Sequence, residues 1–201
     1  MRARAACLAL AFLLPLAGGV RAGETGDLRD LRVGMPAAAL PAEGYAGFAC
    51  AADPAIALGG WQDWRRCPAD AAGLRAVRFR YRDGETMVAG HPVRLVLAID
   101  GAARVGALHI ETDPAAPPYL RKKAFLLGLQ AKARYGQAGW QCREGAPDAT
   151  AQPIGDTFVA ERCEKRLDDR RIVVERESFR NPDAPAHSFV NASRIDILAN
   201  P

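Results

Sequence analysis

The sequence predicts an α+β fold of two similar halves, each a helix packed on an antiparallel β-meander and stabilised by a disulfide. Three observations support this prediction. Short segments of alternating apolar and polar residues follow one another across short links, one segment near the middle has helical spacing, and Gly, aromatic and Cys residues recur in the same order in both parts. The expected boundaries are residues 23–115 and 116–201, after a signal peptide at residues 1–22.

The first 22 residues are typical of an export signal. Arg2 and Arg4 precede an apolar run over residues 5–16, and a small-x-small cleavage site ends at Ala22. Without this segment, which also contains Arg21, 24 basic side chains stand against 23 acidic ones in 179 residues. This balance excludes a strongly cationic nucleic-acid-binding protein. The signal is also the only stretch long enough to suggest a membrane span, so none is expected in the mature chain.

Six segments have the alternation of half-buried strands. In Ala76–Arg82, three apolar residues alternate with Arg78, Arg80 and Arg82, which gives one apolar and one basic face. The links are short and Asp100-Gly101 favours a hairpin turn, so neighbouring strands are expected to be antiparallel. The other expected strands are Pro92–Ile99, Val105–Thr112, Thr157–Leu167, Arg171–Phe179 and Ser188–Leu198.

The strongest helical pattern covers Pro118–Tyr135. Proline suits the first helical position, apolar residues recur every three or four positions, and Gly136 can end the helix. A shorter helix is expected at Pro36–Leu40, and Pro114–Pro118 is the expected linker. One helix per half would cover one face of each meander.

The cysteines support an internal repeat. A Gly-aromatic-x-Cys motif ends at Cys50 and again at Cys142, and a second cysteine follows 17 positions later at Cys67 and 21 positions later at Cys163. The fifth cysteine, Cys7, lies in the signal. In an oxidising compartment four cysteines allow three pairings, and the repeat favours Cys50 with Cys67 and Cys142 with Cys163. The alternative is a four-thiolate metal site, although no C-x-x-C spacing occurs.

The arrangement of Leu31–Pro36, which contains Gly34-Met35, before a cysteine-clipped loop and a β-meander resembles the small envelope proteins of the outer-membrane-assembly lipoprotein group. Their leading signature is a Val/Ile-x-x-Gly-Met element before a helix, and the tandem form resembles the β-lactamase inhibitor protein fold. The chain lacks the lipidated cysteine of the assembly lipoproteins. The resemblance implies binding of other proteins rather than catalysis, and it transfers no site residue.

Side chains suited to catalysis or metal binding are few. His91 and His187 are expected in solvated loops. His109 and Glu111 lie two positions apart on one expected strand, so their side chains share a face and could bind a metal or move a proton. The alternative for this pair is an exposed polar face. Neither a cofactor nor enzymatic activity is expected.

Three groups of side chains are candidate binding surfaces. Trp61 and Trp64 lie in the loop between the first two cysteines, where indoles could contact a partner or pack in the core. The second group is the arginine row of Ala76–Arg82. The third is the helix over Pro118–Tyr135, which could dock an acidic partner or an anionic membrane or simply be solvated. Its basic residues, with no acid among them, are Arg121, Lys122, Lys123, Lys132 and Arg134.

These features predict an exported, non-catalytic binding or accessory protein. Its partner would be an envelope or periplasmic protein, engaged through Trp61, Trp64 and the arginine row, and its role that of an inhibitor or assembly factor. Abundant Ala, Arg and Gly are typical of a high-GC bacterial genome, which makes the periplasm the expected compartment. The alternative is a small periplasmic metal-binding protein or enzyme that uses His109 and Glu111. No nucleic-acid partner is expected.

Overall fold

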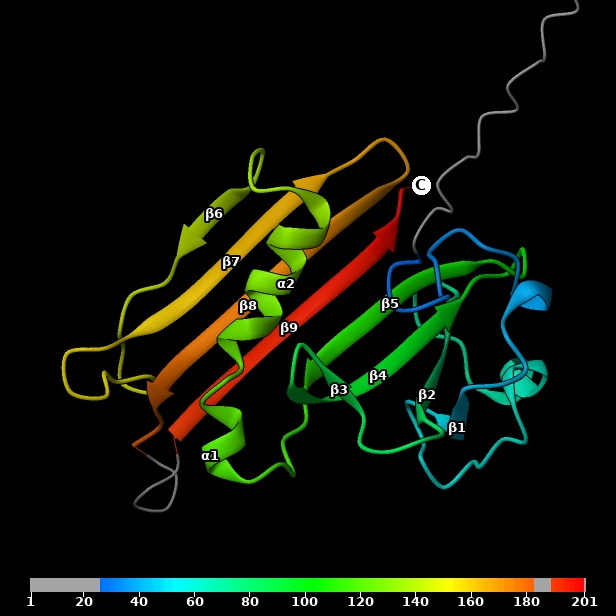
Figure 1. Ribbon diagram of the computed structural model, residues 1–201, viewed down its shortest axis with the longest axis horizontal. Helices are drawn as coiled ribbons and strands as arrows, with labels where there is room; N and C mark the ends of the chain where they lie inside the picture. The colour runs from blue at the N-terminus through cyan, green and yellow to red at the C-terminus, as the bar shows by residue number, and fades with distance from the viewer. Residues whose placement is uncertain (1–25, 183–188, 201) are drawn as a thin grey trace, which may run out of the picture.

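Nine strands form one antiparallel sheet in the computed structural model, which describes residues 26–182 and 189–200 (Figure 1). The strands lie in the order β1-β2-β4-β5-β9-β8-β7-β6, and β3 pairs with β4 beside this path. A helical layer covers part of one face, so the predicted α+β class is confirmed. The strands are β1 Tyr45–Cys50, β2 Arg75–Tyr81, β3 Met87–Val88, β4 His91–Ile99, β5 Val105–Thr112, β6 Gln141–Glu144, β7 Val159–Arg166, β8 Arg170–Arg180 and β9 Phe189–Ala199.

The alternating pattern located β2, β4, β5, β7, β8 and β9 to within a few residues. Ser188, the expected start of the last strand, lies outside the described residues. The three strands that the pattern missed are short or irregular. All four residues of β6 are exposed, and the register of β1 shifts between Ala46 and Ala49, so neither presents a simple apolar face.

Pairing of β5 with β9 joins the two meanders into a continuous sheet. One hydrophobic cluster contains buried side chains from both halves, so the core is shared across the expected boundary at residues 115 and 116. A row of fully buried side chains crosses β4, β5, β9 and β8 on the same face of the sheet. Its members are Leu97, Leu108, Ile197 and Ile172.

The expected helix over Pro118–Tyr135 is present but bent. It consists of α1 (Pro118–Arg121) and α2 (Phe125–Tyr135). Between them, the Lys123 N–H donates to the Leu120 carbonyl, a tight i→i+3 turn that interrupts the regular α-helical bonding. No helix within residues 26–182 and 189–200 is long and apolar enough to cross a membrane.

α2 packs across β8 and β9 and covers the apolar face of the sheet there (Figure 1). Leu127 and Ala131, one turn apart on α2, are buried between the helix and the sheet. Gly128 allows the close approach, because a Cβ at this position would lie 3.4 Å from Val174 Cγ1 and 3.1 Å from Arg176 Cδ. The helical spacing of apolar residues is therefore confirmed for Ala124, Leu127 and Ala131, whereas Phe125 and Leu129, which the pattern places beside this stripe, are exposed.

The first half contains no α-helix among the described residues, so the expectation of one helix per half is not confirmed. The expected helix at Pro36–Leu40 is a 3-10 helix of three residues, Ala37–Ala39. Leu40 has extended backbone, φ −64° and ψ 136°, because the ring of the following Pro41 disfavours the helical conformation. A second 3-10 helix, Trp61–Arg66, and the buried side chains of residues 28–33 pack into the core of this half instead.

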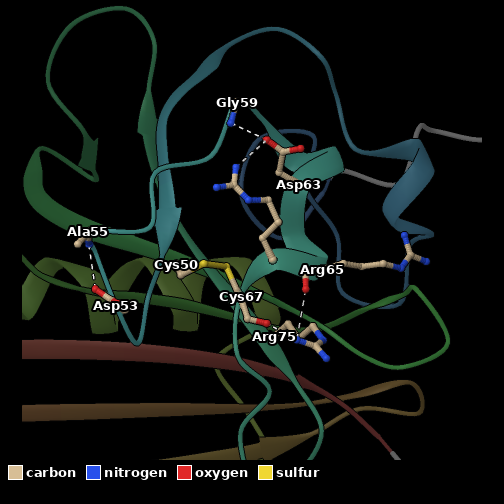
Figure 2. Close-up of a disulfide and its surroundings, with 9 residues drawn as sticks. Cys50, Asp53, Ala55, Gly59, Asp63, Arg65, Cys67 and Arg75 are labelled. Atoms are coloured by element: carbon tan, nitrogen blue, oxygen red, sulfur yellow. Dashed lines mark hydrogen bonds and ion pairs between the residues drawn. A yellow bond between two sulfur atoms is a disulfide. The ribbon is translucent and has the colours of Figure 1, made fainter.

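Both predicted disulfides are present, Cys50–Cys67 and Cys142–Cys163. Figure 2 shows the loop that the first one closes. Within this loop the Asp63 carboxylate accepts a hydrogen bond from the Gly59 N–H at 2.7 Å, and at its end the Cys67 carbonyl accepts one from the guanidinium of Arg75, the first residue of β2. Two disulfides are typical of proteins that fold in an oxidising compartment, which agrees with export.

The expectation that His91 is solvated is wrong. It begins β4 on the apolar face of the sheet, where its side chain is fully buried and its Nε2 lies 3.0 Å from Thr112 Oγ1. The Thr112 hydroxyl in turn donates to the Ser193 carbonyl of β9, so this histidine lies where the two meanders join. His187 lies outside the described residues.

Burial lowers the pKa of His91, so we expect the protein to lose stability as the pH falls below about 6.5. Below that pH His91 is protonated in the unfolded chain, whereas in the folded protein it stays neutral until the pH reaches its lower folded-state pKa. The loss has a limiting slope of about 1.4 kcal/mol per pH unit. Urea denaturation of the wild type and of His91→Gln between pH 5 and pH 8 measures it. Identical pH dependence of the two proteins would contradict this assignment.

Candidate binding surface

The face of the sheet opposite the core carries a row of alternating charges. In the strand register, Arg94 lies opposite Glu111, Glu111 opposite Arg194, Arg194 opposite Glu175, and Glu175 opposite Arg162. Arg94 Nη2 is 2.7 Å from Glu111 Oε1, and Arg162 also forms an ion pair with Glu175. Opposite charges on neighbouring strands favour this register. The row runs from β4 to β7 and crosses the β5–β9 junction, so the open face is continuous over both meanders.

The centre of this row holds His109 in a hydrogen bond with Asp196. Nδ1 of the imidazole lies 2.6 Å from the carboxylate Oδ1, which also accepts a hydrogen bond from Arg194 Nε at 2.7 Å. Burial alone would raise the pKa of Asp196, but the hydrogen bonds from these two groups outweigh it and lower the pKa. The aspartate therefore stays ionised and holds the imidazole in place.

The structure pairs His109 and Glu111 with different partners. The histidine bonds to Asp196 and the glutamate to Arg94, although both side chains lie on the same face as the sequence predicted. Within the described residues, the one group of three side chains close enough to share a metal ion is Cys142, Cys163 and Glu161, and its two sulfur atoms form a disulfide. Oxidised sulfur is a poor metal ligand, because the thiolate is the binding form.

Arg78 and Arg80 differ from the arginines of the charged row. In the part of the chain that the structure describes, neither forms an ion pair; the Arg78 side chain has no hydrogen-bond partner, and Arg80 Nη1 contacts only the Tyr81 carbonyl, at 3.4 Å. Both are on β2, two positions apart, and so project from the same face. Two unpaired guanidinium groups side by side leave a local positive excess on the sheet.

A groove of about 850 Å³ lies beside these arginines. Arg78, Arg80 and Arg94 line it, together with the connection Asp113–Pro117 that leads from β5 to α1. Asp113 and Glu85 also line the groove, and the Asp113 carboxylate accepts a hydrogen bond from the Ala115 N–H at 2.9 Å. The groove therefore combines a cationic wall with a wall whose two prolines restrict the backbone.

Trp61 and Trp64 are buried in the core, the alternative that the sequence left open. The ring of Trp61 makes edge-to-face contacts with Phe79 and Phe48 at centroid distances of 4.9 and 4.7 Å, and its Nε1 donates to the Pro41 carbonyl at 3.0 Å. Both indoles therefore stabilise the first half and are not presented as a surface.

Of the three predicted arginines, the structure brings Arg78 and Arg80 to the groove and leaves Arg82 outside it. Arg82 follows the end of β2 and is exposed. Sequence reasoning did not include Arg94 or the Asp113–Pro117 wall. Arg94 lies on the polar face of a correctly predicted strand. However, the alternating pattern does not show that this strand, β4, pairs with β2 and so brings Arg94 beside the other two arginines.

Comparisons of the chain with protein-family models, with curated proteins and with solved structures found no match.

Proposed function

We propose that the protein is an exported periplasmic binding or accessory protein that engages an acidic segment of an envelope or periplasmic protein partner. The observation that carries this proposal is the groove beside Arg78 and Arg80. These two arginines lack acidic partners within the described residues, whereas three other arginines of the same face, Arg94, Arg162 and Arg194, are paired with carboxylates.

The chemistry of the groove favours carboxylates as the ligand groups. A guanidinium presents a planar fork of donors that matches a carboxylate, and such charge-assisted hydrogen bonds are stronger than neutral ones. Arginine is also among the residues enriched where proteins bind one another. A volume of about 850 Å³ has room for several residues of an extended segment.

The role of an inhibitor or assembly factor follows from the resemblance to envelope proteins and stays part of this proposal. The alternative, a metal-binding protein or enzyme based on His109 and Glu111, gives a different result in a simple measurement. It requires stoichiometric metal in the purified protein that disappears in His109→Ala. The binding proposal requires none.

Removal of both groove arginines tests the proposal. Periplasmic extract is passed over immobilised wild-type protein, over Arg78→Ala/Arg80→Ala, and over Arg66→Ala/Arg166→Ala, which removes two exposed arginines elsewhere. We expect a partner that the wild type and the control variant retain and that the groove variant binds at least about tenfold more weakly, because two charged hydrogen-bond donors are lost. Unchanged affinity of the groove variant would contradict the proposal.

A further inference from the structure

The outer face of the helical segment carries apolar side chains that the fold does not bury. Tyr119 is 68 % exposed, Phe125 45 % and Leu129 55 %. The one further large apolar side chain that is exposed in the described residues is Phe189, which lines a cavity of about 330 Å³ together with Arg121 of α1. Exposed apolar side chains gathered on one region, rather than scattered singly, indicate a contact surface.

Two of these apolar side chains, Phe125 and Leu129, belong to α2. Leu127 and Ala131 face the core, whereas Leu129 lies on the outer side of α2. Phe125, one helical turn before Leu129, lies on the adjoining flank, where it is 45 % exposed and also lines a small cavity with residues of β8 and β9. Lys122 precedes Phe125 by three positions and Lys132 follows Leu129 by three, so a lysine stands at each end of the apolar pair. The result is a convex strip with an apolar centre and cationic ends.

The same segment has a pronounced positive excess. No acidic residue occurs between Asp113 and Glu144, a stretch with six basic side chains. Five of them belong to the helical segment, and within residues 26–182 and 189–200 none of the five forms an ion pair. Glu177 of β8 lines a small cavity with Lys122 and Phe125, but it alternates with the core-facing residues of its strand and so shares the face of Glu175, opposite to α2. The five residues are Arg121, Lys122, Lys123, Lys132 and Arg134.

We propose that the outer face of α1 and α2 docks on an anionic phospholipid bilayer, with Phe125 and Leu129 in the headgroup region and the flanking lysines on the lipid phosphates. A surface helix with an apolar centre and basic flanks is suited to lie in the plane of such an interface. Each basic side chain near an anionic surface adds to the attraction, and lysine stems can extend to reach the headgroups. A convex strip fits a planar bilayer, whereas an acidic protein partner would need a matching concave surface.

Docking through this face would leave Arg78 and Arg80 accessible, although Leu120 of α1 lines the same groove. α2 packs on the apolar face of the sheet, and Arg78 and Arg80 project from the opposite face. The protein could then hold a partner near the membrane surface. The membrane contact does not depend on the proposed partner, because the two surfaces share no side chain.

Vesicle flotation tests the membrane contact with the full-length gene product recovered from the periplasmic fraction. The vesicles consist of phosphatidylcholine alone or with about 30 % phosphatidylglycerol. We expect association with the anionic vesicles, no association with the neutral ones, and release at high salt, since a Debye length of about 3 Å at 1 M screens surface charge. We expect Lys122→Gln/Lys132→Gln and Phe125→Ala/Leu129→Ala each to weaken partitioning about tenfold.

Two controls separate this contact from other effects. Arg66→Gln/Arg166→Gln removes the same charge from another surface and should bind anionic vesicles like the wild type, as should Arg78→Ala/Arg80→Ala. All variants should unfold at the wild-type temperature, because the replaced side chains are exposed or lack partners in the core. Equal binding to both vesicle types, no binding, or an equal loss in the control would overturn the proposal. So would capture of an acidic protein by this face without any vesicle binding.

Discussion

Replacement of Asp27 by alanine is expected to lower the free energy of unfolding by about 3–5 kcal/mol. The side chain of Asp27 is 3 % exposed and forms an ion pair with Arg170, the first residue of β8. It also accepts hydrogen bonds from the Tyr135 hydroxyl at the end of α2 and from the Val33 N–H, each at 2.8 Å. The alanine variant removes the buried one of the two carboxylates that pair with the Arg170 guanidinium, and it leaves an unpaired hydroxyl and an unpaired N–H.

This network connects segments that are distant in the sequence. The carboxylate lies near the start of the described chain, whereas its partners lie 108 and 143 positions later. Burial and the neighbouring carboxylate raise the pKa of Tyr135, so its phenol stays protonated and remains a donor. Replacement of Asp27 should therefore loosen the packing of the N-terminal segment against α2 and against β8 at the same time.

Asp169→Ala is the matched control for Asp27→Ala. This aspartate pairs with the same arginine, but its side chain is 59 % exposed, so its removal should change stability by about 1 kcal/mol or less. Urea denaturation at neutral pH gives both values. The double variant Asp27→Leu/Arg170→Met should recover part of the loss, since it leaves no buried charge. Similar losses for Asp27→Ala and Asp169→Ala would contradict the role assigned to burial.

Removal of the Cys50–Cys67 disulfide is expected to lower the free energy of unfolding by about 2–5 kcal/mol, and more than removal of Cys142–Cys163. The two bridges close loops of similar length, with sequence separations of 17 and 21, so loop entropy alone predicts similar effects. Their surroundings differ. Cys50 and Cys67 are both buried in the core, whereas Cys142 is exposed on the edge strand β6.

The double variants Cys50→Ala/Cys67→Ala and Cys142→Ala/Cys163→Ala measure this difference by urea denaturation. In the first, alanine leaves a cavity in the hydrophobic core that also contains Trp61 and Trp64, which adds to the lost cross-link. In the second, β6 can separate from β7 while the rest of the sheet stays paired, which hydrogen exchange would detect as faster exchange in residues 141–144. Equal losses of global stability would show that loop entropy dominates at both sites.

Local patterns in the sequence determined the main elements. The alternation in Ala76–Arg82 predicted β2 and its basic face, because side chains of a strand point to opposite sides wherever that strand is placed. The spacing over Pro118–Tyr135 predicted the helix and the buried positions Leu127 and Ala131 for the same kind of reason, although Phe125 and Leu129 of the same apolar pattern are exposed. The repeat of Gly, aromatic and Cys predicted both disulfides, since each bridge closes a loop within one part of the chain.

The pairing of distant segments was decided by the tertiary structure alone. Alternation assigns a face to a strand but does not name its neighbour, so the β5–β9 junction and the charged row across it could not be predicted. Arg78 and Arg94 share a groove for the same reason. The burial of His91 depends on Thr112 and on the β9 strand behind it, contacts far away in sequence. Local spacing determines which face a side chain occupies, whereas its burial and its partners depend on the segments that pack against it.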